Sequence, residues 1–339
     1  MKKILYLSTG GTISSIRSSE GIIPAMGAEA MLELVPSIRK KYDIEARTIM
    51  NIDSTNMQPQ DWIKLAEAVF EGISRFEGIV ITHGTNTMAY TASALSFMIK
   101  NPGKPIVITG SQIPIEDEGS DAKRNLIDAF ITASEPISGV FVVFNGRLMI
   151  GSRVTKLRTK HPDAFYSINS SDIGLLWNGK VHYLQKPALY KKGTPELHPA
   201  ICPDVFLIKV FPGLNPDIFD KLLRMGVKGI VIEGYGLGSI PFSGKDFIME
   251  LKKLIEKGVC TIITTQSLLD GTDLTLYEDG RQCLEIGVIE GRDMTTETLI
   301  VKLMWALGQT NNMEEVRKII ETNYAGEMTP EGGSGLQLP

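Results

Sequence analysis

The sequence predicts an α/β protein with two domains, each a mainly parallel sheet with flanking helices, and the N-terminal domain the larger. The chain has 339 residues, which is too long for one ordinary hydrophobic core. Short apolar runs alternate with helical patterns, which is typical of repeated strand–helix units. The apolar runs are continuous, as expected for strands buried on both faces of a parallel sheet.

The N-terminal domain is expected over residues 1–187. Its strand candidates are, in order, "KILYLSTGG", "IEARTIMNID", "GIVITHGT", "KPIVITGSQ" and "SGVFVVFNG". The helical patterns between them are "AEAMLELVPSIRKKY", "QPQDWIKLAEAVFEGISRF", "NTMAYTASALSFMIK" and "DAKRNLIDAFITAS". In the second of these, one face carries the apolar side chains of Trp62, Leu65, Ala66, Val69 and Ile73.

Beyond Gly151 the pattern fades into a basic, irregular segment, and a stretch rich in Pro, Lys and Gly predicts a linker at residues 188–204. The rhythm resumes in a C-terminal domain at residues 205–325. Its strand candidates are "VFLIKVFPG", "GIVIEGYG" and "VCTIITTQ", with two more helices after Met294. Residues 326–339, rich in Gly and Pro, are expected to fray.

Composition and charge argue against several classes of partner. The formal net charge is −4, so we expect no nucleic-acid partner. No apolar run approaches the length of a bilayer span, so we expect no membrane partner. Three widely spaced cysteines, Cys202, Cys260 and Cys283, indicate reduced thiols and a cytoplasmic location. We expect no metal and no cofactor, because neither ligand spacing nor a phosphate loop is present.

Hydroxyl side chains follow the ends of four predicted strands, where an open parallel sheet binds its ligands. They are Thr12, then Ser54 with Thr55, then Thr85 beside Asn86, and finally Ser111. Short polar residues at these places are also good helix N-caps. Four such loops at one edge nevertheless favour a binding site.

A threonine hydroxyl becomes a nucleophile only when a base takes its proton. A lysine with a lowered pKa can be that base, and Lys156 in "RVTKLRTK" is a candidate, although the residues alone do not select it over its basic neighbours. His83 precedes the Gly-Thr pair, and its side chain is expected to point into the sheet.

Four short motifs resemble those of the bacterial-type L-asparaginase family: "TGGTI", "DST", "THGTNTM" and "VTK". In the second domain "EGYGLGSIP", "TTQSLLDGTDLTLY" and "KLMWALG" resemble the cytoplasmic (type I) and archaeal branch. The resemblance implies hydrolysis of L-asparagine to L-aspartate and ammonia through a threonine acyl-enzyme, without metal or cofactor. It also implies a homodimer or homotetramer whose active sites lie between subunits.

The resemblance also implies a role for each matching residue. Thr12 matches the nucleophile, and Thr85 matches the second threonine, which works with the lysine matched by Lys156. Ser54 and Thr55 match positions that hold the substrate's α-carboxylate and α-amino groups. Ser111 lies on the loop that lines the side-chain amide.

Two positions depart from the family pattern. Asn86 stands where the family has an aspartate that binds the substrate's α-ammonium and touches the lysine. Ile22 stands at the position of a tyrosine in the loop after the first threonine. These departures leave two alternatives open: hydrolysis of a related amide that lacks a free α-ammonium, or a ligand-binding protein with little turnover. Asn86 could also be only the N-cap of the next helix.

Overall fold

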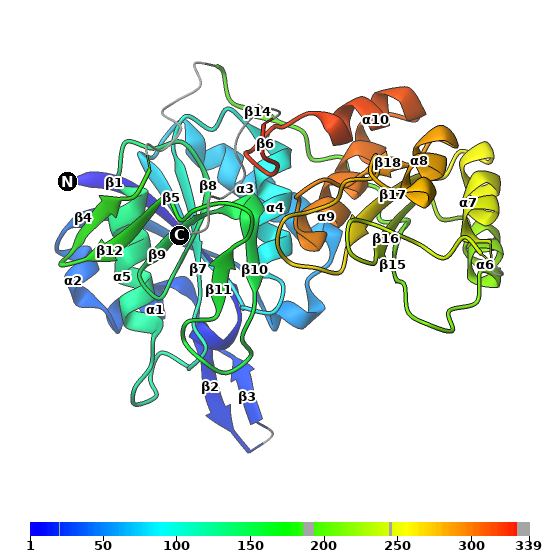
Figure 1. Cartoon of the computed structure of the whole chain (residues 1–339). Coiled ribbons are helices and arrows are strands. Elements are labelled where there is room, and N and C mark those ends of the chain that lie inside the picture. Colours follow the sequence, from blue (N-terminus) through cyan, green and yellow to red (C-terminus); the bar gives the residue numbers. More distant parts are fainter. Residues whose placement is uncertain (20, 186–192, 244–245, 331–339) are drawn as a thin grey trace. The chain divides into compact units, whose positions relative to one another are not determined.

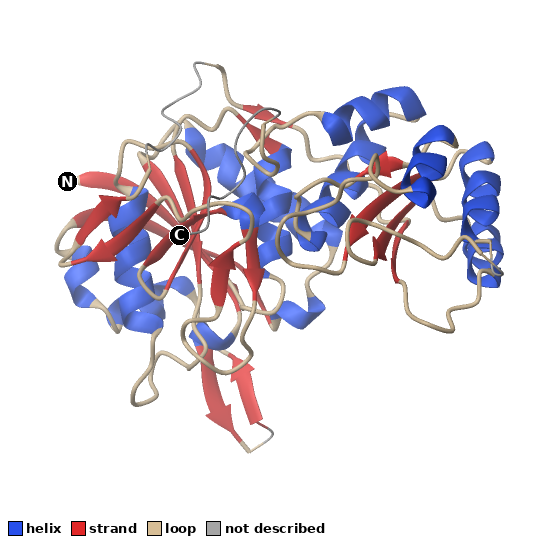
Figure 2. Ribbon diagram, in the orientation of Figure 1, coloured by secondary structure: helices blue, strands red, loops and turns tan. Residues whose placement is uncertain are grey.

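The computed structural model describes residues 1–19, 21–185, 193–243 and 246–330. The chain divides into two compact units, Met1–Ser167 with Ser171–Pro199, and Ile168–Ser170 with Ala200–Pro339. Each unit has its own sheet flanked by helices (Figure 2). The predicted fold class is therefore confirmed: both sheets are mainly parallel, and the larger one belongs to the N-terminal unit. Within the described ranges, no helix is long and apolar enough to cross a membrane.

In the described part of the first unit, eight strands form one sheet in the order β13-β12-β9-β8-β7-β5-β1-β4. Most of these strands are labelled in Figure 1. Strands β4, β1, β5, β7 and β8 pair in parallel, whereas β9, β12 and β13 are added antiparallel. The strands are β1 (Lys2–Gly10), β4 (Tyr42–Ile52), β5 (Gly78–Thr82), β7 (Pro105–Thr109), β8 (Gly139–Phe144), β9 (Arg147–Ile150), β12 (Gly174–Trp177) and β13 (Lys180–Tyr183).

Three small antiparallel pairs accompany this sheet. They are β2 (Ser15–Ser18) with β3 (Gly21–Pro24), β10 (Val154–Lys156) with β11 (Phe165–Ser167), and β6 (Ile99–Lys100) with β14 (Glu196–Leu197). Short 3-10 turns lie at Thr12–Ser14 (η1), Ser54–Asn56 (η2) and Gly151–Arg153 (η3). The first two turns directly follow β1 and β4, so they begin at the carboxyl edge of the sheet.

Helices cover both faces of the first sheet because its parallel strands are apolar on both sides. Helices α1 (Ala28–Glu33), α2 (Pro36–Arg39) and α5 (Ala122–Ala133) share one core with alternate strand residues such as Tyr6 and Val107. Helices α3 (Pro59–Ile73) and α4 (Met88–Met98) pack against each other and against the sheet. In α3, Gly72 lies directly against Leu5 of β1.

In the described part of the second unit, four parallel strands are ordered β15-β16-β17-β18. They are β15 (Val205–Lys209), β16 (Gly229–Gly234), β17 (Cys260–Thr265) and β18 (Ile289–Glu290). One face packs on α6 (Asp217–Met225), α7 (Phe247–Glu256) and α8 (Glu278–Glu285). The other face packs on α9 (Thr296–Gln309) and α10 (Met313–Glu321).

Several details differ from the sequence-based expectation. The first expected helix is two helices, because Pro36 lacks the N–H that a continuous helix requires. Strand β4 is an edge strand with intermediate and exposed residues, so it is not buried on both faces. The segment after Gly151, expected to be irregular, contains β10 to β13, whose three or four residues each are too few to show a period.

The C-terminal segment also differs from expectation. Fraying was expected from residue 326, yet Glu327 and Met328 are buried, and Thr329 donates hydrogen bonds to Asp293. Residues 331–339 of the expected tail, and residues 188–192 of the expected linker, lie outside the described residues.

Candidate active site

Two glycines bring three loops of the sheet edge together. Gly11 follows β1 and Gly84 follows β5, and a Cβ added to Gly11 would lie 2.2 Å from the Gly84 Cα. A Cβ on Gly84 would lie 2.5 Å from the Oγ of Ser54, which follows β4. Only glycine permits such close approach of backbones. Thr12 and Thr85, each the next residue after one of these glycines, are thereby held on adjacent loops.

Thr85 contacts the candidate lysine directly. The Lys156 Nζ lies 2.6 Å from the Thr85 Oγ1 and 3.1 Å from the Asn86 Oδ1. Thr85 is buried and Lys156 half-buried, and burial lowers the pKa of the Lys156 ammonium below its usual value. A lysine with a lowered pKa beside a hydroxyl is the arrangement that a general base requires.

Asn86 does not cap the following helix. The N-cap of α4 is Thr87, and the Asn86 side chain is exposed and accepts from Lys156. The interpretation of Asn86 as a cap alone is therefore wrong. Thr87 instead donates through its hydroxyl to the Ser54 carbonyl at 2.8 Å, which ties the start of α4 to the loop after β4.

Gln112 is a residue of the site that the sequence analysis did not name. Its Nε2 donates to the carbonyls of Arg158 and His161, at 3.3 Å each. Because carbonyls only accept, the orientation of the amide is determined, and its Oε1 faces Thr85. The Thr85 hydroxyl donates to this oxygen at 3.2 Å, so its lone pairs are directed toward Lys156. The signal was available, since Gln112 immediately follows Ser111 at the end of β7.

The remaining predicted residues lie at the same edge of the sheet but differ in burial and in hydrogen bonding. Ser54 is buried against Gly84, and Thr12 begins the turn η1 with intermediate exposure. Thr55 is exposed, and both its N–H and its hydroxyl donate to Asp53. Ser111 is fully buried, and its hydroxyl donates to the Ile113 carbonyl at 2.6 Å. The side chain of Ile22 lies outside the described residues.

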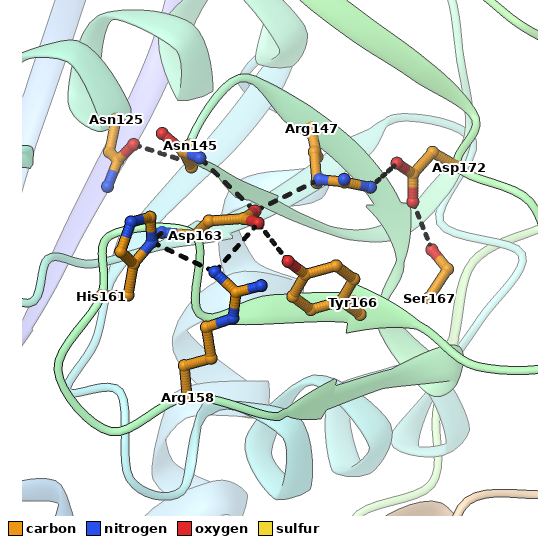
Figure 3. Close-up of polar contacts among 9 residues, drawn as sticks. All are labelled: Asn125, Asn145, Arg147, Arg158, His161, Asp163, Tyr166, Ser167 and Asp172. Carbon is orange, nitrogen blue, oxygen red and sulfur yellow. Dashed lines mark hydrogen bonds and ion pairs between the residues drawn. The ribbon is translucent and has the colours of Figure 1, made fainter. Parts of the chain in front are cut away.

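The loop after Lys156 is held by a polar network centred on Asp163 (Figure 3). The Asp163 carboxylate accepts hydrogen bonds from Tyr166 and Asn145 and lies 3.4 Å from Arg147 and 3.8 Å from Arg158. Burial opposes ionisation, but these donors and cations together lower the pKa of the Asp163 carboxyl. This loop supplies the carbonyls that orient Gln112, so the network supports the surroundings of Thr85.

A second set of polar groups shapes the loop after β7. The Asp121 carboxylate accepts the backbone N–H groups of Gln112 and Ile113 at 3.1 Å. Asn125, fully buried in α5, donates to the Gly110 carbonyl at 2.9 Å and accepts the Asn145 N–H at 3.0 Å. Asn125 in α5 and Asp121 just before it thus bind one carbonyl and two N–H groups of this loop. These bonds fix the backbone that carries Ser111 and Gln112.

Comparison with known proteins assigns the chain to a family. The model described as "Asparaginase, N-terminal" matches residues 3–189, and that of the "Glutaminase/Asparaginase C-terminal domain" matches residues 204–320. The chain belongs to the asparaginase family. It is an amidohydrolase, and the resemblance stated from its motifs is confirmed.

Individual members show the extent of the likeness. The L-asparaginase of Thermococcus kodakarensis is 45% identical over 96% of this chain and 99% of its own, and its structure superposes with a TM-score of 0.92. The L-asparaginase 1 of Escherichia coli K12 is 36% identical over 97% of this chain and 99% of its own. The L-asparaginase I of Vibrio cholerae, a solved structure, is 31% identical, covers 97% of this chain and 99% of its own, and superposes with a TM-score of 0.86.

Proposed function

We propose that this member of the asparaginase family hydrolyses L-asparagine to L-aspartate and ammonia through a threonine acyl-enzyme. The observation that supports this most directly is the contact between Lys156 Nζ and Thr85 Oγ1, beside a loop that carries Thr12. The names of the L-asparaginase relatives supply the substrate class.

The proposed steps use only side chains of this edge. The Thr12 Oγ1 attacks the side-chain amide carbon, and its proton leaves to the threonine and lysine pair. Collapse of the tetrahedral intermediate breaks the C–N bond, and the departing nitrogen takes that proton from the pair to leave as ammonia. Water then attacks the ester on Thr12 and gives a proton to the threonine and lysine pair. That proton returns to the Thr12 oxygen as the ester C–O bond breaks, and L-aspartate is released.

Substrate binding is assigned to the neighbouring loops. Ser54, Thr55 and Asn86 would hold the α-carboxylate and α-ammonium groups, and the loop of Ser111 would line the amide. Because the Ser111 hydroxyl donates to the Ile113 carbonyl, Ser111 would contact the amide through its backbone. No metal or cofactor enters this chemistry.

Asn86 favours a second candidate substrate class. An aspartate at this position would give a charged hydrogen bond to a substrate ammonium, and such a bond is about twice as strong as a neutral one. Asn86 offers a neutral amide instead. An asparagine-type amide whose α-nitrogen is acylated carries no charge there. Its binding would therefore be weakened less when asparagine replaces aspartate at position 86.

The family resemblance supports a homodimer or homotetramer, and the free thiols support a cytoplasmic location. Cys202, Cys260 and Cys283 form no disulfide among the described residues. Burial raises the pKa of the Cys260 and Cys283 thiols to about 12, so both are unreactive.

Ammonia release tests the proposed function. Free and N-acylated asparagine and glutamine would be compared with the Thr12→Ala and Thr85→Ala variants. Each variant should lose nearly all turnover. Its unfolding free energy should fall by no more than the loss of a helix-capping side chain costs, about 0.5–2 kcal/mol. A variant that kept the parental rate would contradict the role of that threonine, and no ammonia from any amide would contradict the function.

A further inference from the structure

A buried histidine lies directly beneath the turn that carries Thr85. His83 directly follows strand β5 and is fully buried, as its position in the sequence predicted. Its Nδ1 lies 2.7 Å from the Gly84 carbonyl oxygen, and its Nε2 lies 2.9 Å from the Thr91 Oγ1 in α4. The Trp62 indole in α3 donates to that same hydroxyl at 3.1 Å. None of the proposed catalytic steps uses this chain of contacts.

The donor and the acceptor of each of these hydrogen bonds follow from the groups at the two ends of the series, the Gly84 carbonyl and the Trp62 indole. A carbonyl oxygen only accepts, so the His83 Nδ1 carries the hydrogen. Burial lowers the pKa of His83 to about 4, so the ring is neutral near pH 7 and its Nε2 is an acceptor. The Thr91 hydroxyl then donates to Nε2 while it accepts from Trp62, which only donates. One tautomer satisfies all four groups.

The bond to Gly84 sets the orientation of a peptide plane. The described chain has no cis peptide bonds, and in a trans peptide the C=O and the N–H point in opposite directions. The Gly84 carbonyl points down to the imidazole. The N–H of Thr85 is therefore directed away from the buried ring.

The Gly-Thr pair after β1 has its carbonyl held in a comparable way. The Gly11 oxygen accepts from the Ser14 N–H at 3.1 Å, the Ser14 hydroxyl at 3.1 Å and the Ser15 hydroxyl at 2.9 Å. Both serines are buried. In both Gly-Thr pairs the carbonyl is therefore fixed by buried side chains, and the N–H of the following threonine faces the opposite way.

We propose that His83 is a positioning residue for amide hydrolysis, which holds the Gly84–Thr85 peptide through its Nδ1–H, with Thr91 and Trp62 fixing its tautomer. This rests on the proposed function. The ring does not exchange protons with substrate. Its part is to keep the Thr85 backbone, and so the hydroxyl beside Lys156, in the geometry that the reaction needs.

Two matched pairs of variants test this role. His83→Asn retains a nitrogen donor near the position of Nδ1, whereas His83→Leu fills the space without any donor. Thr91→Ser retains the hydroxyl, whereas Thr91→Val removes it at nearly constant shape. We expect kcat of the Leu variant to fall about 100-fold, as a small misplacement of reacting groups does, with a smaller change in KM. His83→Asn and Thr91→Ser should recover most of the loss shown by their partners.

A spectroscopic readout separates positioning from general packing. Nitrogen-15 correlation spectra of the parental protein should show the Nδ1–H tautomer of His83 across neutral pH, and Thr91→Val should reduce its population. A resonance typical of the Nε2–H tautomer in the parental protein would overturn the proposal. So would equal kcat for His83→Asn and His83→Leu in folded proteins. If the parental protein released no ammonia, the tautomer would still be measurable, so the proposed function would fail separately.

Discussion

At the scale of single residues, the charge beside Lys156 depends on Asn86. Its Oδ1 lies 3.1 Å from the lysine nitrogen, so a carboxylate there would stabilise the ammonium form and raise the lysine pKa. Asn86→Asp should therefore need a higher pH for full rate. It should bind free asparagine more tightly by roughly tenfold or more, because a charged hydrogen bond contributes about 1.5–3 kcal/mol.

Rate–pH profiles and KM for free and N-acylated asparagine measure both effects of Asn86→Asp. Asn178→Asp is the matched control, since it adds the same charge at the exposed turn between β12 and β13. An Asn86→Asp variant with the parental pH profile, KM and substrate ranking would refute the electrostatic argument.

His83 predicts a specific loss of stability in acid. Its pKa is about 4 in the folded protein and 6.5 in the unfolded chain, so unfolding takes up a proton between these values. The contribution of neutral His83 to the unfolding free energy is constant above pH 6.5. It is lost as the pH falls toward 4, by about 3 kcal/mol in total. Denaturant unfolding at pH 7 and pH 4.5 should show a steeper loss for the parental protein than for His83→Asn, and parallel losses would contradict the assignment.

Residues of the candidate site were predictable where the chain itself places them near a strand end. Thr12, Thr85 and Ser111 each follow a glycine, and Ser54 lies two residues beyond the end of β4. A parallel sheet brings such positions together. Asn125 was not predictable, because its partners Gly110 and Asn145 are joined to it only by the packing of α5 against the sheet.

At the scale of elements, one buried ion pair joins helix α9 to the C-terminal segment. Lys302 Nζ lies 2.7 Å from Glu327 Oε1, both side chains are fully buried, and the lysine also donates to the Ile320 and Thr322 carbonyls. Burial lowers the pKa of Lys302 despite the nearby carboxylate. Glu327 in turn accepts the backbone N–H groups of Tyr324 and Ala325.

Lys302→Met should therefore destabilise the second unit strongly. It leaves the Glu327 carboxylate buried without its cation, a change that typically costs about 3–5 kcal/mol in unfolding free energy. The double variant with Glu327→Gln should recover part of this loss. Lys253→Met, which breaks a solvent-screened pair with Glu250, is the control and should change the unfolding free energy far less than Lys302→Met does. Equal denaturation midpoints for the two single variants would contradict this account.

Long elements with a clear period were predictable, and short ones were not. Helix α3 follows its 3.6-residue apolar face, and β1, β5, β7 and β8 follow their unbroken apolar runs. Strands β10 and β11, of three residues each, form because Val154 to Lys156 pair with Phe165 to Ser167. That pairing depends on the loop network around Asp163, which leaves no local pattern in the sequence.

At the scale of the whole molecule, the two family models match the two ends of the chain with a gap between residues 189 and 204. The sequence predicted a two-domain organisation because the strand–helix rhythm stops and then resumes. The order of strands within each sheet was not predictable, since β1 pairs with both β4 and β5, and no local pattern selects that arrangement.

We expect a homo-oligomer in solution, as the family resemblance implies. Light scattering at micromolar concentration should give at least twice the mass of one chain, 37.2 kDa. Thr12→Ala should show the same mass, because it changes the chemistry and leaves the fold intact. A monomer with full amide hydrolysis would contradict the expectation of shared sites.

The contact between Gly11 and Gly84 limits how this enzyme could evolve. A methyl group on Gly11 would lie 2.2 Å from the Gly84 Cα, and one on Gly84 would lie 2.5 Å from the Ser54 Oγ, so neither position offers a first step for mutation. A second substitution cannot compensate at Gly11, because the obstacle there is main chain, which no substitution removes. Adaptation to a new amide must then proceed through neighbours that face open space, such as the exposed Asn86. The two glycines would therefore stay unchanged in descendants of this enzyme. Substitutions at nearby residues could change the substrate preference without changing the geometry of the reacting groups.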